Sequence, residues 1–300
     1  MPRFAANLSL MYTEMPFLER FQAAHQDGFK YVECLFPYEH DSRTLQHLLH
    51  QSQLKQVLIN TPPAGANGAL VSKMWDAGMR GVASLPGHEQ EFEDGFKMAL
   101  RYAIAMGSGQ IHVMAGCIPK EFQSKSSGTP YPLTSSDLSE HEGPLLDTYL
   151  KNLFKAANLA AQEGIDVLIE PINTRDIANY FLNRQSQAHA IVQTLGLSNL
   201  KVQMDLYHCQ IVEGDLISKI KHYLPTGRVA HIQVAGVPSR EELHLGELNY
   251  LDIFQVLDET ALACRWEGFV GLEYRPKHGA EPGGTSKGLS WLKSAVNWQD

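Results

Sequence analysis

The sequence predicts an α/β protein built as a closed (β/α)8 barrel. Eight short apolar stretches, each followed by a stretch with helical periodicity, run from the N-terminus to the C-terminus. This alternation predicts parallel strands joined by right-handed crossovers, and eight units favour closure of the sheet. Polar residues also end four successive strands. These residues are Glu170, Asp205, Gln233 and Glu273, separated by 35, 28 and 40 residues, about one strand–helix unit each.

The composition supports one domain over residues 1–300. The chain has 300 residues, of which 44% are hydrophobic, and no shift in composition suggests a boundary. An open doubly wound sheet is the alternative architecture. Its phosphate-binding fingerprint is missing, because the glycine-rich GAEPGGTSK at 279–287 lacks the P-loop spacing and follows the last strand.

Charge and cysteine content narrow the function classes. The net charge of −8 argues against binding to nucleic acid as the main task. The four cysteines are widely spaced and form no CxxC pair, which is typical of reduced thiols in the cytoplasm. The sequence contains neither a basic start followed by an apolar run nor a long apolar segment, so we expect no signal peptide and no membrane contact.

The strands are expected to be short and apolar, and most end at a proline or a polar residue. They are predicted at 3–9, 31–36, 56–60, 110–115, 166–170, 201–205, 229–235 and 269–273. At the fifth strand, Val167, Leu168 and Ile169 form the apolar run, Glu170 ends it, and Pro171 cannot continue the ladder.

The helices are predicted from apolar residues at intervals of three and four. They are expected near 17–27, 42–51, 89–106, 145–162, 186–195, 216–224 and 250–260, with a last one around 289–292. Asp41 and Asp215 are the expected N-caps of the second and sixth helices, because aspartate accepts hydrogen bonds from free N–H groups. Residues 64–87 form a long connection, and the polar insertion at about 116–144 is either a mobile lid or disordered.

Period-two alternation places the polar strand-end residues on common faces. His231 shares one face with Gln233 in the seventh strand. Gly271 shares a face with Glu273 and Arg275 in the eighth, and Gln203 with Asp205 and Tyr207 in the sixth. These faces are expected to turn inward at the mouth of the barrel, where barrel enzymes carry their catalytic groups.

Three carboxylates at one mouth indicate a metal site. Carboxylates brought close together repel one another unless a cation lies between them or they take up protons. The donor set is all oxygen, which favours Mg²⁺ or Mn²⁺ over Zn²⁺. The alternative is that each carboxylate separately caps a helix or pairs with a basic residue.

The chain also resembles the hydroxypyruvate isomerase family, a group of xylose-isomerase-like TIM barrels. The matching motifs are FAANLS at 4–9, NTPP at 60–63, HVMAG at 112–116, EPINTR at 170–175, MDLYH at 204–208, HIQVA at 231–235, GELNY at 246–250 and GLEYRP at 271–276. The resemblance implies a metal quartet of Glu170, Asp205, Gln233 and Glu273. It also implies that Glu170 and Glu273 donate and accept the proton.

The implied reaction interconverts hydroxypyruvate and 2-hydroxy-3-oxopropanoate (tartronate semialdehyde) through an enediolate. By resemblance, His208 contacts substrate oxygens and Asp176 matches an acidic substrate-binding position of related epimerases. Arg240 or Arg275 could hold the substrate carboxylate by a two-point contact. His112 and Glu33 are candidates by strand placement alone, and a structural histidine or a surface arginine is the alternative for this group. An assembly of identical subunits is compatible with the sequence.

Other reactions remain open at this stage. Family members also act on larger 2-oxo acids such as 2-oxo-tetronate, and residues 71–80, 116–144 and 277–287 look extended relative to shorter members. A sugar epimerase or an inosose-type dehydratase on the same barrel would use the same metal. A nuclease of the endonuclease IV kind would need a histidine-rich zinc site and a basic face. A sugar-binding protein would not need two glutamates able to transfer protons.

Overall fold

The structure is a computed structural model and describes residues 2–122 and 143–296. Within these ranges eight parallel strands close into one barrel, in which each strand pairs with the next and β8 pairs with β1. The strands are β1 (Phe4–Asn7), β2 (Tyr31–Cys34), β3 (Lys55–Asn60), β4 (Gln110–His112), β5 (Asp166–Ile169), β6 (Leu200–Asp205), β7 (Val229–Val234) and β8 (Phe269–Leu272). The predicted (β/α)8 barrel is confirmed.

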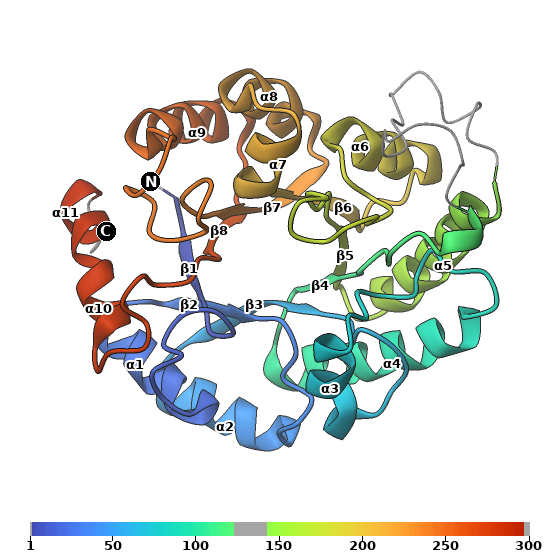
Figure 1. The fold of residues 1–300 in the computed structure, drawn as a ribbon, viewed down its shortest axis with the longest axis horizontal. Helices are drawn as coiled ribbons and strands as arrows, with labels where there is room; N and C mark the ends of the chain where they lie inside the picture. The colour runs from blue at the N-terminus through green and yellow to red at the C-terminus, as the bar shows by residue number, and fades with distance from the viewer. Residues whose placement is uncertain (1, 123–142, 297–300) are drawn as a thin grey trace.

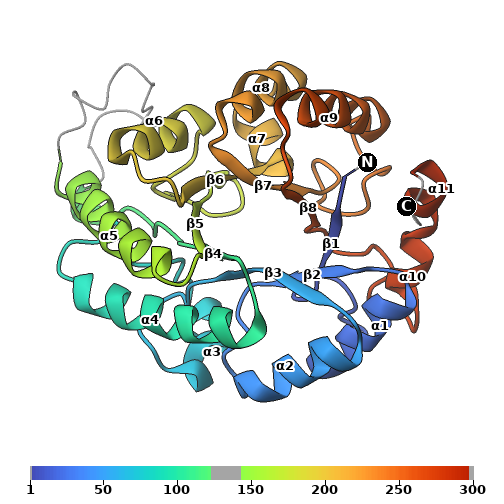
Figure 2. The ribbon, with the colours of Figure 1, turned by 180° about the vertical axis from the view of Figure 1, so that it is seen from behind.

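Helices surround the barrel (Figure 1). The α-helices are α1 (Arg20–Gln26), α2 (Ser42–Gln51), α3 (Val71–Asp76), α4 (Glu89–Met106), α5 (Pro144–Ala161), α6 (Gln185–Leu195), α7 (Leu206–Val212), α8 (Leu216–Tyr223), α9 (Tyr250–Cys264), α10 (Gly284–Gly288) and α11 (Ser290–Ala295). Short 3-10 turns are η1 (Phe17–Glu19), η2 (Gly68–Leu70), η3 (Lys120–Phe122) and η4 (Leu224–Thr226). Seen from behind, α10 and α11 again lie beside α1, so the last helices cover the start of the chain (Figure 2).

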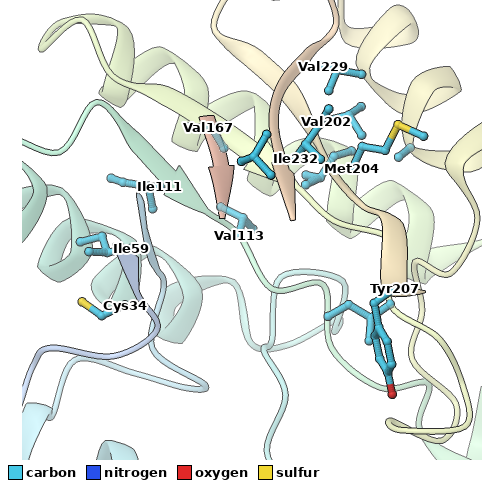
Figure 3. Close-up of a cluster of buried hydrophobic side chains, with 14 of the residues drawn as sticks. Cys34, Ile59, Ile111, Val113, Val167, Val202, Met204, Tyr207, Val229 and Ile232 are labelled. Atoms are coloured by element: carbon cyan, nitrogen blue, oxygen red, sulfur yellow. The ribbon is translucent and has the colours of Figure 1, made fainter. Parts of the chain in front are cut away.

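The main hydrophobic core is built on the outward faces of the strands. Figure 3 shows Ile59, Ile111, Val167, Val202 and Ile232, which come from five neighbouring strands. These side chains are fully buried and belong to one cluster with apolar residues of the helices. Burial of one such aliphatic side chain contributes about 1.5–3 kcal/mol, so this interface fixes the positions of the strands.

The inside of the barrel is divided between apolar and polar residues. A small apolar cluster contains Ala5, Val57, Leu58 and Leu168. Nearer the carboxyl ends of the strands the inward residues are polar and buried, as the period-two alternation predicts. The strands therefore hold polar groups on a rigid frame at one mouth of the barrel.

Several helix ends follow the sequence signals. The side chain of Asp41 accepts hydrogen bonds from the backbone N–H groups of Arg43 (3.0 Å) and Thr44 (3.1 Å) and so caps α2 as predicted. Helix α4 ends at Gly107 and α6 at Gly196, both with a left-handed backbone that glycine adopts at low cost.

The long connection predicted at 64–87 is present between β3 and α4, and it contains α3. Three local predictions are wrong. Asp215 lies at the N-cap of α8 but makes no side-chain cap, because its own backbone is left-handed with φ of 54°. Strand β6 stops at Asp205 and α7 begins at once, so Tyr207 lies on a helix and not on the strand face. Arg275 likewise lies beyond β8.

The predicted polar insertion at 116–144 falls mostly outside the described residues, and its extent and the assignment of 1–300 to one domain stay predictions. Across residues 2–122 and 143–296, no helix is both long and apolar enough to cross a membrane.

Glu14 accepts from the N–H (3.0 Å) and hydroxyl (2.9 Å) of Thr285, and Lys293 donates to Asp27 (2.7 Å). These bonds hold the C-terminal helices against the connection before α1 and against the end of α1.

Replacing Asp41 by Ala should lower the free energy of unfolding by about 0.5–2 kcal/mol, because two N–H groups of α2 lose their acceptor. Asp41→Asn is the matched control, since asparagine keeps a capping oxygen and should stay close to the wild-type value. Urea unfolding followed by circular dichroism measures both. Equal stability of Asp41→Ala and Asp41→Asn would contradict a capping role.

Candidate active site

Three carboxylates meet at the carboxyl ends of their strands. Glu170 directly follows β5, Asp205 is the last residue of β6, and Glu273 directly follows β8. Asp205 is also the N-cap of α7, where its Oδ1 accepts from the N–H groups of Tyr207 (2.7 Å) and His208 (3.3 Å). The immediate change from strand to helix therefore fixes one carboxylate and places His208 beside it.

These carboxylates and His208 form a compact group of potential metal ligands. One side-chain ligand atom from each of Glu170, Asp205, His208 and Glu273 lies within 4.8 Å of the others, and all four residues are buried. Mg²⁺ takes oxygen ligands at about 2.0–2.1 Å, so opposite ligands of one ion lie about 4 Å apart. The group is thus close to the spacing that one ion requires.

The electrostatics of the cluster are those of buried negative groups in contact. Burial raises the pKa of Glu170, and the charges of Glu273 and Asp205 raise it further. Burial also raises the pKa of Glu273 to about 8, against the lowering effect of Arg240. It raises the pKa of Asp205 to about 6, although Arg240 and two backbone N–H groups oppose the rise. A positive charge inside the cluster would therefore stabilise the ionised form of each carboxyl group.

The residues present fit a hard divalent cation. Glu170 Oε1 is buried and accepts no hydrogen bond, which leaves a lone pair facing the cluster. Asp205 and Glu273 also offer carboxylate oxygens, His208 offers a ring nitrogen, and thiols are absent from the group. Oxygen donors of this kind suit Mg²⁺ or Mn²⁺ better than Zn²⁺.

The hydrogen bonds of His208 give it a donor role. The backbone N–H of Asp176 donates to Asn173 Oδ1 (2.8 Å), which turns Asn173 Nδ2 toward His208 Nδ1 (2.6 Å). Burial lowers the pKa of His208 well below its usual value, so the ring is neutral. Since Nδ1 accepts, the proton lies on Nε2, which is 3.6 Å from Asp205 Oδ2 and 3.9 Å from Glu170 Oε1. In this tautomer Nε2 can donate to a substrate oxygen and cannot bind a metal.

Gln233 is the register partner of Asp205 in the neighbouring strand, and both ends of its amide are engaged. Its Oε1 accepts from Gln203 Nε2 (2.6 Å), and its Nε2 donates to Glu33 Oε1 (2.7 Å). The oxygen therefore faces Gln203. The role of Gln233 as fourth ligand stays a prediction.

Arg240 is the positive group that faces the carboxylates. Its guanidinium contacts Glu273 and lies 3.8 Å from Asp205 Oδ2 and 3.8 Å from Asp176 Oδ2. Burial alone would lower the pKa of Arg240, but the charges of Glu273, Asp205 and Glu170 outweigh burial and raise it. Arg240 is thus charged and next to the space in which a substrate would lie.

A cavity of about 690 Å³ opens over the cluster. It brings together most of the predicted site residues. The cavity is lined in part by His112, Glu170, Asp176, His208, Arg240, Glu273 and Arg275. One side carries aromatic side chains, including Phe36 and Trp75, whose ring centres are 5.2 Å apart.

His112 is fully buried, and its Nδ1 lies 3.5 Å from Glu170 Oε2. Burial, followed by the effect of His231, lowers the pKa of His112 to about 3, so the ring is neutral. Neither of its ring nitrogens has a hydrogen-bond partner. The structure thus places His112 beside Glu170, in keeping with a substrate-facing position.

Sequence reasoning missed several polar residues of the site. Asn7 ends β1 and donates from Nδ2 to Glu273 Oε1 (3.3 Å), and Asn173 orients His208. Both belong to the motifs quoted above, and the strand-end rule that found Glu273 would also have found Asn7. Period-two alternation placed Gln203 on the same face as Asp205, but its contact with Gln233 of β7 could not be read from the sequence.

The comparisons with known proteins agree with this geometry. The family model described as "Xylose isomerase-like TIM barrel" matches residues 21–295. The chain belongs to this family. It is also 47% identical over 293 residues to a 2-oxo-tetronate isomerase of Cupriavidus necator, covering 98% of each chain. It is 37% identical over 292 residues to the hydroxypyruvate isomerase of Escherichia coli, covering 97% of this chain and 98% of that one.

Solved structures of the family share the barrel. A Brucella melitensis protein titled AP endonuclease, family 2, has a TM-score of 0.81 and 39% identity, covering 98% of this chain and 99% of that chain. The 3-keto-D-glucoside 4-epimerase of E. coli has a TM-score of 0.68 at 18% identity, covering 98% of this chain and all of that one. The second likeness shows the fold alone.

The affinity of the site for Mn²⁺ should rise with pH between about 6 and about 8. Below these values Asp205 and Glu273 hold protons that a cation must displace, and above them both are ionised. Each displaced proton steepens the rise by about tenfold in affinity per pH unit. Calorimetric titration of the protein with Mn²⁺ in several buffers measures the affinity and the protons released. An affinity independent of pH over this interval would contradict the assigned electrostatics.

Proposed function

We propose that this protein is a metal-dependent isomerase that interconverts hydroxypyruvate and 2-hydroxy-3-oxopropanoate by proton transfer between adjacent carbons. The observation that carries the proposal is that Glu170 and Glu273 belong to one buried group of potential metal ligands, and that both line the same cavity. Relatives named hydroxypyruvate isomerase and 2-oxo-tetronate isomerase support the reaction class.

The protein residues supply the acid and base of the reaction. One of Glu170 and Glu273 removes the proton from C3 of hydroxypyruvate, which gives an enediolate, and the other carboxyl group returns a proton at C2. The hydroxyl proton on the C3 oxygen passes to the C2 oxygen, so that C3 becomes the carbonyl carbon and C2 carries the hydroxyl. Burial raises the pKa of both groups, so one can hold a proton while the other is ionised. A divalent cation would be held by Glu170, Asp205 and Glu273 with Gln233 as the proposed fourth ligand, and it would supply Lewis-acid stabilisation of negative charge on the substrate oxygens.

Other residues bind and orient the substrate. His208 Nε2–H points into the cluster and can donate to an oxygen of the enediolate, where negative charge develops. Arg240 or Arg275 binds the substrate carboxylate, Asp176 accepts from a substrate hydroxyl, and His112 lies beside Glu170. Strand ends hold the two glutamates on opposite sides of the cluster, so little reorganisation accompanies the reaction.

A four-carbon 2-oxo acid is the second candidate substrate. A cavity of about 690 Å³ lies in the range of sites for much larger ligands, so a three-carbon acid would fill only part of it. The C. necator relative is named a 2-oxo-tetronate isomerase. The proposal thus covers 2-oxo-tetronate as an alternative substrate at the same catalytic groups.

Epimerase, dehydratase and nuclease activities are less well supported. An inosose-type dehydratase would release water, whereas isomerisation conserves the mass of the substrate. A nuclease would bind a polyanion, and the net charge of −8 opposes this. Among the described residues one group could hold a metal, and it contains a single histidine.

Purified protein that has been treated with chelator should convert hydroxypyruvate only after Mg²⁺ or Mn²⁺ is added. Proton NMR follows the product, and parallel assays with 2-oxo-tetronate compare kcat/KM for the two acids. Absence of turnover of both acids with either metal would contradict the proposal. Loss of water from the substrate would favour a dehydratase.

Glu273→Gln should reduce isomerisation by about 10²–10⁴-fold, because an amide cannot exchange the proton. The amide oxygen remains a potential ligand, so Mn²⁺ should still bind, more weakly. Exchange of substrate C–H protons with D₂O and calorimetric Mn²⁺ binding separate the two effects. Arg43→Gln on the exposed face of α2 is the control and should behave as wild type. Normal turnover by Glu273→Gln would remove Glu273 from proton transfer.

A further inference from the structure

A buried carboxylate lies beneath the catalytic cluster and has no place in the reaction described above. Glu33 is the third residue of β2 and is 1% exposed. Its oxygens accept hydrogen bonds from Asn7 Nδ2 (2.9 Å) and Gln233 Nε2 (2.7 Å), and lie 2.7 Å from His231 Nε2. A buried carboxylate with three polar partners from two other strands is a costly arrangement that packing alone does not require.

The barrel leaves space for this carboxylate at one glycine. A Cβ atom added to Gly271 of β8 would lie 2.4 Å from Glu33 Oε2 and 2.6 Å from Glu33 Oε1. Any residue other than glycine at position 271 would displace the Glu33 carboxylate. The carboxylate can therefore lie here only because residue 271 has no side chain.

Glu33 determines the direction of a chain of amides. An ionised carboxylate only accepts hydrogen bonds, so Gln233 must present its NH₂ group to Glu33 and its oxygen to the other side. On that side the oxygen accepts from Gln203 Nε2 (2.6 Å). A flipped Gln233 would place its oxygen against the Glu33 carboxylate and its NH₂ against that of Gln203.

A second arm runs from Glu33 to the catalytic Glu273. Asn7 Nδ2 donates both to Glu33 Oε1 (2.9 Å) and to Glu273 Oε1 (3.3 Å). The oxygen of Asn7 is held by the backbone N–H of Ser9 (3.1 Å), which fixes this amide as well. Both arms therefore start at one carboxylate, and the second ends on Glu273.

We propose that Glu33 is a positioning residue that orients the catalytic Glu273 and turns the Gln233 oxygen away from itself, through two hydrogen-bonded arms of side-chain amides. The arms are Asn7 to Glu273 and Gln233 to Gln203. The proposal rests on the proposed function in taking Glu273 as a proton-transferring group. Residues that orient metal ligands in this way typically contribute about 10–100-fold to metal affinity or activity.

Two variants test the role of Glu33 in different ways. Glu33→Gln removes the acceptor-only group, because a glutamine can offer either end of its amide to Gln233. Gly271→Ala leaves every donor and acceptor in the chain but forces the carboxylate to move. Both should weaken Mn²⁺ binding by about 10–100-fold, and kcat should fall at saturating Mn²⁺ with a smaller change in KM.

A metal-free measurement distinguishes positioning from a general loss of structure. In ¹H–¹⁵N spectra of the wild-type protein, the side-chain NH₂ signals of Gln233 and Asn7 should be shifted by their bond to a carboxylate; Gln233→Glu and Asn7→Asp identify the signals. Both signals should move in Glu33→Gln and Gly271→Ala. Glu14→Gln is the control, because Glu14 also accepts two hydrogen bonds but at Thr285. It should change neither the signals nor Mn²⁺ affinity.

Wild-type Mn²⁺ affinity and unshifted amide signals in folded Glu33→Gln would overturn the proposal. If Glu33→Gln does not fold, the same result in Gly271→Ala would overturn it. Restoration of Mn²⁺ affinity in Glu33→Gln/Gln233→Glu, which exchanges carboxylate and amide, would support it. These readouts need no substrate, so they remain decisive even if the wild-type protein turns over neither oxo acid and the proposed function fails.

Discussion

Repulsion between carboxylates that are packed together away from water is the constraint on which the rest of this site depends. Glu170, Asp205 and Glu273 are buried, and burial makes each of them hold a proton more tightly than it would in water. An arrangement of this kind persists only where the surroundings supply compensating charge and hydrogen-bond donors. The guanidinium of Arg240, the first N–H groups of α7 and the side-chain amides of the strands provide them here.

The barrel tolerates the unfavourable burial of these carboxylates because the surrounding helices fix the positions of its strands. The outward apolar faces pack with the helices into one large cluster, which holds the inward faces in position independently of what they carry. Polar residues can then occupy the carboxyl end of the barrel interior. The hydrogen bonds between these residues also fix their orientation. The Glu33 carboxylate only accepts hydrogen bonds, so each neighbouring side-chain amide must turn its NH₂ group toward it.

Shared architecture does not decide the reaction. Proteins of 14–18% identity have the same barrel, and the names of those proteins include epimerases of different sugars. Loops after the strands shape the cavity, and here the connection after β3 contributes α3 and the aromatic side chain of Trp75. The connections thus shape the cavity, whereas the cluster that could hold a metal lies at the strand ends.

The sequence by itself determined the order of elements, the closed barrel and the group of polar residues at its mouth. Hydrophobic periodicity and strand-end residues are local properties, and all strands of a parallel barrel end at the same mouth, so Glu170, Asp205 and Glu273 could be placed together without coordinates. Only the tertiary structure decided the tautomer of His208, the early start of α7 and the hydrogen bonds of Gln233. It also revealed the role of Glu33, whose bonds join residues such as Glu33 and His231 that lie 198 positions apart. No local pattern carries such contacts, because they exist only once the barrel has closed.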